Sequence, residues 1–138
     1  MKSFVLSFII LGSALSFGAN AGVIEDRKAN FKANVSILRA IQSQIQSGDF
    51  EAVAAGGRKI ADWAQQMPEF FPEGSESPGA LDAIWMDFDD FRMKADANKQ
   101  AALNLEMAAQ TEDAGKIMAA VQKLSGTCKS CHQSYKAN

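Results

Sequence analysis

The residues best suited to chemistry stand close together near the C-terminus, in the run Cys128-Lys129-Ser130-Cys131-His132. A C-x-x-C-H run is the attachment signature of a c-type haem. Two thiols at this spacing reach the two vinyl groups of one porphyrin as thioethers, and the adjacent imidazole ligates the iron. On a helix, Cys128, Cys131 and His132 share one face, because positions i, i+3 and i+4 are neighbours there. We therefore predict one covalently attached haem c per chain, with His132 as an axial ligand.

Other interpretations of the cysteine pair explain less. A thioredoxin-like dithiol would need a βαβ pattern around the pair, and the sequence shows no strand pattern. A structural zinc site needs four ligands, whereas two cysteines and one histidine are all that this chain has. A disulfide between Cys128 and Cys131 leaves the following histidine without a role, and it stands as the main alternative to haem.

The N-terminal segment has the pattern of a secretory signal peptide. Met1-Lys2 is a short basic start, residues 4–17 are apolar apart from serine and glycine, and Ala19-Asn20-Ala21 gives an A-x-A cleavage site. The apolar run is too short for a membrane span. An uncleaved anchor is the alternative interpretation. Cleavage after Ala21 leaves residues 22–138, a chain of 117 residues that suffices for one domain. We expect a periplasmic protein without membrane association after cleavage, since bacteria attach c-type haem outside the cytoplasm.

Charge excludes one class of partner. The full chain has a formal net charge of −2, and removal of Lys2 with the signal peptide makes it −3. There is no basic run or patch, so we expect no binding to nucleic acid.

Helix-period patterns fill most of the mature chain, without internal repeats. We expect helices at about 24–46, 49–67 and 77–110 and from about 111 onward, with residues 68–78 as the one long connection. Asp49 is a good N-cap type for the second helix, and Ser77-Pro78 has the N-cap and N1 types for the third. Gly56-Gly57 would let another helix or a flat ring come close. The pattern predicts an all-α protein, an antiparallel four-helix bundle with the porphyrin between helices near one end.

Apolar stripes indicate which faces are buried. Ile37 and Ile41 lie beside the stripe of the first helix and point towards a second subunit. Trp63 and Trp85 are expected to pack in the core or on the ring, with no redox role. The first-helix stripe comprises Ile24, Arg27, Phe31, Val35, Leu38 and Ile45. The inward residues of the third helix are Leu81, Ile84, Trp85, Phe88, Phe91, Ala95 and Ala102.

The sequence offers no evident sixth ligand for the iron. His132 is the only histidine, so a bis-histidine haem within one chain is excluded. The first helix contains no Met, His or Cys and presents Phe31 instead. The alternative interpretation of Phe31 is an ordinary core aromatic. An apolar pocket opposite His132 would leave the iron five-coordinate and favour NO or CO over O₂. Met67 is expected to fill the core, and the other methionines lie off the inward stripes or far along the last helix: Met86, Met93, Met107 and Met118.

These residues resemble the cytochrome c′ family, the class II c-type cytochromes, over the whole mature chain. Cys128-x-x-Cys131-His132-x-x-Tyr135-Lys136 is similar to the family pattern C-x-x-C-H-x-x-[FY]-R. The central loop Phe70-Phe71-Pro72-Glu73-Gly74-Ser75 and the pair Ile84-Trp85 followed by Phe91 are further matches. Arg27 and Phe31 stand where the family has an arginine followed, four residues later, by the distal pocket residue.

The resemblance implies a homodimeric four-helix bundle with high-spin haem in the bacterial periplasm. It places Arg27 near a haem propionate and Phe31 over the vacant iron position. Lys136 would lie near the exposed edge of His132, where the family has arginine. Lysine keeps the charge but lacks the planar fork of arginine. A related branch, the cytochrome c-556 type, has a methionine ligand in place of Phe31 and is six-coordinate.

The leading prediction is a five-coordinate, high-spin haem protein that transfers one electron and binds NO or CO. The first alternative is a six-coordinate, low-spin electron carrier without gas binding, ligated by a side chain such as Met67. The second is a peroxidase or NO reductase, but peroxide cleavage normally uses a distal acid–base group and the only histidine is already proximal. The third is a haem-free interaction bundle with a disulfide. We therefore predict no enzyme, and the redox partners are not specified by the sequence.

Overall fold

The computed structural model describes residues 16–137, with side chains from residue 22 onward. Five α-helices and one 3₁₀ helix make up this part of the chain, which contains no strand. Residues 1–15 of the predicted signal peptide lie outside the described residues. No helix found in residues 16–137 is both long and apolar enough to cross a membrane. The elements are α1 (Ser16–Ser47), α2 (Phe50–Gln66), η1 (Met67–Phe70), α3 (Ala83–Met86), α4 (Phe88–Ala109) and α5 (Ala114–Tyr135).

Aspartate side chains begin three of the long helices. Asp49 Oδ1 accepts a hydrogen bond from Ala52 N at 3.1 Å, as its position before α2 predicts. The same role falls to Asp87 at α4 and to Asp113 at α5. Between α1 and α2 the chain turns at Gly48, whose φ of +74° suits a residue without Cβ. Local signals of this kind set most of the helix boundaries.

The third helix does not begin at Ser77, so that prediction is wrong. Its place is taken by a loop over residues 71–82, the single turn of α3, and then α4 from Phe88. The polar groups of the loop are used elsewhere: the Ser77 hydroxyl accepts from Arg27, and Ser77 O accepts from Ala80 N. Leu81 N donates to Tyr135 O at 3.0 Å. Contacts with α1 and α5 therefore override the local helix signal of Ser77-Pro78.

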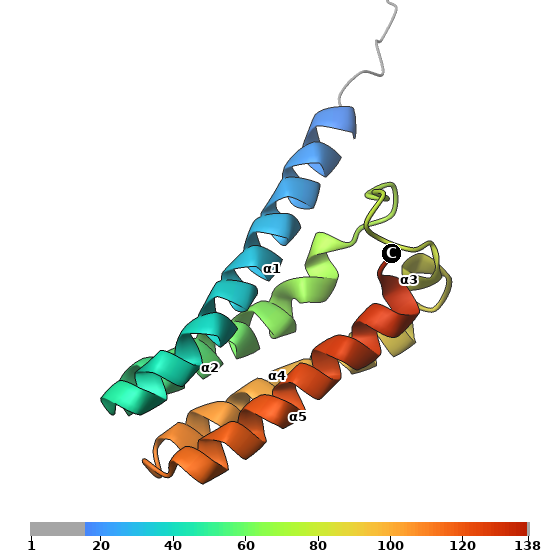
Figure 1. Ribbon diagram of the computed structural model, residues 1–138. Coiled ribbons are helices and arrows are strands. Elements are labelled where there is room, and N and C mark those ends of the chain that lie inside the picture. The colour runs from blue at the N-terminus through green and yellow to red at the C-terminus, as the bar shows by residue number, and fades with distance from the viewer. Residues whose placement is uncertain (1–15, 138) are drawn as a thin grey trace, which may run out of the picture.

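The four long helices pack in the order α1 on α2, α2 on α4, and α4 on α5, and this confirms the predicted four-helix bundle (Figure 1). Gly57 permits the close approach of α2 to α4, since a Cβ there would lie 2.9 Å from Ala102 O and from Glu106 N. A Cβ at Gly56 would lie 2.7 Å from Ile37 Cγ2 on α1. Within the described residues, α1 and α5 do not pack along one another, and Figure 1 shows them diverging towards the loop.

The core has two parts. The first, which we call the aliphatic core, fills the half of the bundle near the α1–α2 and α4–α5 turns. The second, which we call the aromatic cluster, lies near the loop and the end of α5. Members of the aliphatic core include Ile41, Val53, Ile60, Ala102, Leu105, Ile117 and Leu124. Members of the aromatic cluster are Trp63, Ala64, Met67, Phe71, Ile84, Phe91, Ala95 and Tyr135, with Phe31, Phe70, Trp85, Phe88 and Cys131 among those packed against them.

Two expectations about the apolar faces are corrected. Ile41, expected beside the stripe and towards a second subunit, is buried in the aliphatic core with 1% of its surface exposed. Val35 and Leu81, both expected inside, are 45% and 40% exposed. The buried face of α1 turns towards Ile37 and Ile41 because Gly56 lets α2 come close to that side. Neither isoleucine therefore supplies an argument for a dimer.

Candidate functional site

The cysteine pair and the histidine lie in the last two turns of α5, as the spacing predicts. Cys128 and Cys131 are free, half-buried thiols, and His132 is exposed. Cys131 packs against the aromatic cluster. Cys128 lies against α4, where Asn98 Nδ2 is 3.5 Å from its Sγ and 2.8 Å from Thr127 Oγ1. Two different neighbours thus hold the two thiols on the inner side of α5.

The protonation of these groups suits haem attachment better than dithiol chemistry. Burial raises the pKa of Cys131 to about 11, and burial also raises the pKa of Cys128, against the hydrogen bond from Asn98. A reactive dithiol needs a lowered thiol pKa. Partial desolvation of the ring, aided by the positive charge of Lys136, lowers the pKa of His132. The imidazole is therefore neutral near pH 7, the form that ligates a metal.

Lys136 lies beside His132, on the side of α5 that faces solvent. A surface depression of about 400 Å³ is lined by Lys129, His132, Gln133 and Lys136. Lys136 also closes the helix, because its N–H donates to His132 O at 3.1 Å. Its predicted location and role on the proximal side of the haem stay a prediction.

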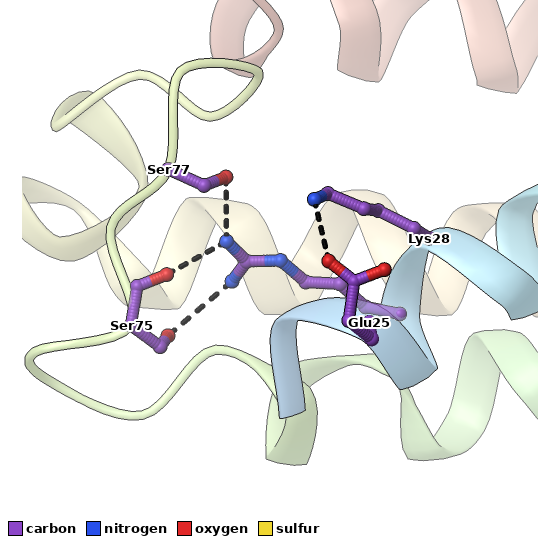
Figure 2. A network of polar contacts seen from close by, with 5 residues as sticks. Glu25, Lys28, Ser75 and Ser77 are labelled. Atoms are coloured by element: carbon purple, nitrogen blue, oxygen red, sulfur yellow. Dashed lines mark hydrogen bonds and ion pairs between the residues drawn. The ribbon is translucent and has the colours of Figure 1, made fainter. Parts of the chain in front are cut away.

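Arg27 is buried on α1 and is hydrogen-bonded to the central loop. Its Nη1 donates to Phe70 O and Ser75 Oγ, both at 3.3 Å, and its Nη2 donates to Ser75 O at 2.7 Å and Ser77 Oγ at 2.8 Å. Figure 2 shows Ser75 and Ser77 turned towards this guanidinium. The Phe71 ring stacks below it, with 4.4 Å between Cζ and the ring centroid. All of these acceptors are uncharged.

Phe31 lies one turn after Arg27 on α1, at the edge of the aromatic cluster. Its ring meets the Trp63 ring edge to face, with centroids 5.5 Å apart. The Trp63 ring in turn meets the ring of Phe70 at 5.0 Å. Phe31 and Cys131 pack against the same cluster from α1 and α5. The structure thus brings the predicted distal residue and the attachment helix to one end of the bundle.

The methionines divide as the sequence indicates. Met67 is buried in the aromatic cluster with 4% of its surface exposed. The remaining four side chains, each at least 40% exposed, are those of Met86, Met93, Met107 and Met118. Met67 is therefore the only one of these five that is buried close to Phe31 and Cys131.

The site fits a covalently bound haem. The two thiols face inward on a helix that α1 does not cover. The described residues offer no acceptor for the buried indole N–H of Trp63, and buried polar groups nearly always have a partner. In the part of the chain that the structure describes, no cluster of three or more His, Cys, Asp or Glu side chains suited to a metal ion occurs.

The sequence did not reveal three polar features of the site, one unpaired group and two contacts. Trp63 was expected to be an apolar packing residue, yet its N–H is buried without a partner. Asn98 was not singled out, although it contacts Cys128. Asp90 accepts a hydrogen bond from the hydroxyl of Tyr135. Only Asn98 could have been found from the sequence, because it is a polar residue among the apolar positions of a helix.

Comparison with known proteins identifies the family. The family model described as cytochrome c′ matches residues 22–136. Cytochrome c′ of Rhodospirillum rubrum is 34% identical over 124 residues, which cover 86% of this chain and 84% of that protein. Cytochrome c-556 of Agrobacterium tumefaciens (strain II Chrys) is 37% identical over 120 residues, 84% of this chain and 98% of that protein. The solved cytochrome c′ of Rubrivivax gelatinosus superimposes with a TM-score of 0.73 at 25% identity, over 86% of this chain and 97% of that one.

The chain belongs to the cytochrome c′ family. Members of this family carry covalently bound haem c, and this chain has the two cysteines that such attachment uses. The predicted family, bundle and cofactor are therefore confirmed. Relatives named cytochrome c′ and cytochrome c-556 both match, so overall similarity does not separate the five-coordinate type from the six-coordinate type.

Proposed function

We propose that this protein is a periplasmic cytochrome with five-coordinate, high-spin haem that transfers single electrons and binds NO or CO. The observation that supports it best is the placement of Phe31. This apolar side chain lies on α1 in the same cluster as Cys131, at the position where a six-coordinate relative would need a ligand. Residues 16–47, which form α1, contain no Met, His or Cys.

Each site residue has a role in this proposal. Cys128 and Cys131 form the thioethers, and His132 is the axial ligand. Arg27 supports a propionate, and Lys136 faces the proximal side. When bound, haem c supplies an iron that cycles between Fe³⁺ and Fe²⁺ and accepts a small ligand at an open axial position.

The apolar ring of Phe31 determines which ligand is favoured. The Trp63 ring meets the rings of Phe31 and Phe70 edge to face, and in this proposal only Phe31 faces the bound ligand. Bound O₂ gains from a polar contact, whereas NO and CO depend on it less. Proteins of this fold do bind these gases: a solved cytochrome c′ variant of Alcaligenes xylosoxidans is a nitric oxide complex, with a TM-score of 0.78 at 21% identity. At that identity the likeness concerns the fold alone.

One observation favours a second candidate, a six-coordinate electron carrier. Met67 is buried in the aromatic cluster together with Phe31, and a thioether is a common axial partner for histidine-ligated haem c. This protein would transfer electrons without binding CO.

An absorption spectrum of the holoprotein separates the two. We expect the dithionite-reduced protein to show a broad spectrum without a sharp α band, and CO to convert it to a new species. A sharp α band that CO leaves unchanged would favour the six-coordinate carrier. Replacement of Met67 by Leu would then identify the ligand, since only a ligated methionine makes the α band disappear when it is removed.

Location and assembly belong to the same proposal. We infer that the first 21 residues are removed on export and that the mature protein forms a homodimer. N-terminal sequencing of protein from the periplasmic fraction should begin at Gly22. Light scattering of the holoprotein should give twice the mass of one chain, and a monomer mass would remove the dimer from the proposal.

A further inference from the structure

Trp63 carries an unpaired polar group in the interior of the protein. Its side chain is 6% exposed, and its Nε1 has no acceptor among the described residues. The only other tryptophan is different: Trp85 Nε1 donates to Phe71 O and Pro72 O, each at 3.1 Å. One indole is therefore satisfied by the loop, while the other has an N–H that the protein itself leaves without a partner.

The immediate neighbours of Trp63 cannot supply a strong acceptor. Its ring is bracketed by the rings of Phe31 on α1 and Phe70 on η1, at centroid distances of 5.5 and 5.0 Å. Both present only carbon and hydrogen to it.

Arg27 is a second unbalanced group at the same place. It is 3% exposed, and its four terminal N–H groups meet uncharged acceptors. No carboxylate among residues 22–137 forms an ion pair with it, and Glu25 pairs with Lys28 instead (Figure 2). Buried charges in proteins are normally paired. The negative charge of Glu76 acts on Arg27, but Glu76 forms no ion pair with it, so the guanidinium has no anion in direct contact.

Phe70 connects the two groups. Its ring contacts the Trp63 ring, and its carbonyl oxygen accepts from Arg27 Nη1 at 3.3 Å. On the other side, Phe31 contacts Trp63 and follows Arg27 by one turn of α1. The unpaired donor and the unpaired cation thus belong to one set of contacts at the loop end of the bundle.

We propose that Trp63 Nε1 donates a hydrogen bond to a propionate carboxylate of haem c, whose charge Arg27 balances. A carboxylate satisfies both groups at once, because it is a strong acceptor and an anion. A gas ligand such as CO or NO is neutral and would leave Arg27 without an anion in direct contact. The inference rests on haem c being bound as proposed, but it does not depend on the number of axial ligands.

The test uses the ferrous holoprotein with CO, which is diamagnetic and suits NMR. The chain has two tryptophans, so two indole N–H signals are expected, and Trp85→Phe assigns them by loss of one. We expect the Trp63 indole proton to show a nuclear Overhauser contact with propionate methylene protons, and the Trp85 proton to show none. A Trp63 contact confined to other haem protons would overturn the proposal. This measurement needs no change at Trp63 itself.

Resonance Raman spectroscopy provides the second measurement. We expect Trp63→Phe, which keeps a ring but loses the donor, to shift the propionate bending mode. The matched control Trp85→Phe should leave that mode in place, and both variants should keep the wild-type CO stretching frequency. A shift of the CO stretch with an unchanged propionate mode would overturn the proposal and place the N–H near the gas ligand. If a sixth ligand keeps the ferrous protein from binding CO, the protein is low-spin and diamagnetic without CO. The nuclear Overhauser contact and the propionate mode then still test Trp63, while the five-coordinate function fails separately.

Discussion

The hydroxyl of Tyr135 donates a hydrogen bond to Asp90 Oδ2 at 2.5 Å. The bond joins the last turn of α5 to the first turn of α4, and Lys94 Nζ lies 3.6 Å from the same carboxylate oxygen. The Tyr135 ring is buried and meets Phe91 edge to face. Because Tyr135 follows His132 by three residues on α5, this contact fixes the end of the helix that carries the proposed axial ligand.

The Tyr135–Asp90 contact predicts a loss of stability at high pH. Burial raises the pKa of Tyr135, as do the hydrogen bond to Asp90 and its negative charge. A raised pKa favours the neutral phenol in the folded state, so its contribution is complete below the unfolded pKa of about 10 and is lost as pH rises from there towards the folded pKa. We expect Tyr135→Phe to lower the free energy of unfolding by about 1–3 kcal/mol at pH 7, with a smaller difference from wild type above pH 10.

Urea unfolding of the wild type and of Tyr135→Phe at several pH values measures this difference. Lysine titration affects both proteins, so it cancels when they are compared. Because Tyr135 is the only tyrosine, phenolate absorbance reports on it alone. We expect the phenolate to form only as the helices unfold. Ionisation near pH 10 with unchanged helical circular dichroism would show that Asp90 does not hold the neutral form.

Arg27 is expected to stabilise the loop as well as the site. Arg27→Gln loses most of four hydrogen bonds worth roughly 0.5–1.5 kcal/mol each, and it also removes a buried charge, which offsets part of that loss. We expect a net loss of about 2–4 kcal/mol in the free energy of unfolding of the holoprotein, and a smaller loss for Arg27→Lys, which keeps the charge without the fork.

Arg58 offers the matched control for Arg27. It forms a surface ion pair with Glu106 at 2.9 Å and is 56% exposed, so Arg58→Gln should change stability by no more than about 1 kcal/mol. Equal losses for Arg27→Gln and Arg58→Gln would contradict the anchoring role of Arg27.

The sequence predicts features that depend on neighbours in the chain. Asp49 as an N-cap depends only on the next turn, and the spacing of Cys128, Cys131 and His132 acts within one helix. The predicted helix start at Ser77 is wrong because Arg27, fifty residues away in the chain, donates a hydrogen bond to the Ser77 hydroxyl. A local helix signal cannot report a distant donor that competes for the same side chain.

The same limit applies to the site. The apolar character of Phe31 is visible in the sequence, and so is the lack of another ligand on α1. The unpaired N–H of Trp63 is not, because an indole has the same sequence signature whether or not an acceptor lies within reach. Trp85, which does find two carbonyls, looks identical at that level. Which polar groups are satisfied is decided by tertiary packing.

Gly57 is expected to be essential for the packing of α2 on α4. A Cβ there would meet backbone atoms of Ala102 and Glu106 at 2.9 Å, and backbone cannot move aside as a side chain can. Gly57→Ala should therefore lower the free energy of unfolding by about 1–3 kcal/mol, although alanine favours a helix by up to about 1 kcal/mol.

Gly126 on α5 supplies the comparison, since nothing lies within 4 Å of its Cβ position. Gly126→Ala should raise stability by up to about 1 kcal/mol. Urea unfolding of both variants gives the two signs, and a stabilising Gly57→Ala would mean that the helices are further apart than described.

Phe31 is the position at which one substitution should change the class of haem centre. Phe31→Met places a thioether on α1, facing the cluster that Cys131 also joins, and the resemblance to the cytochrome c-556 branch implies a methionine ligand at this position. We expect the reduced variant to show a sharp α band and to bind CO at least about tenfold more weakly, because CO has to displace a bound ligand. Phe31→Leu is the control: it is apolar and cannot ligate, so it should keep the broad reduced spectrum and bind CO. CO titration of the dithionite-reduced proteins measures both. An unchanged broad spectrum in Phe31→Met would show that residue 31 does not face the iron, and the gas-binding proposal would lose the observation that supports it best.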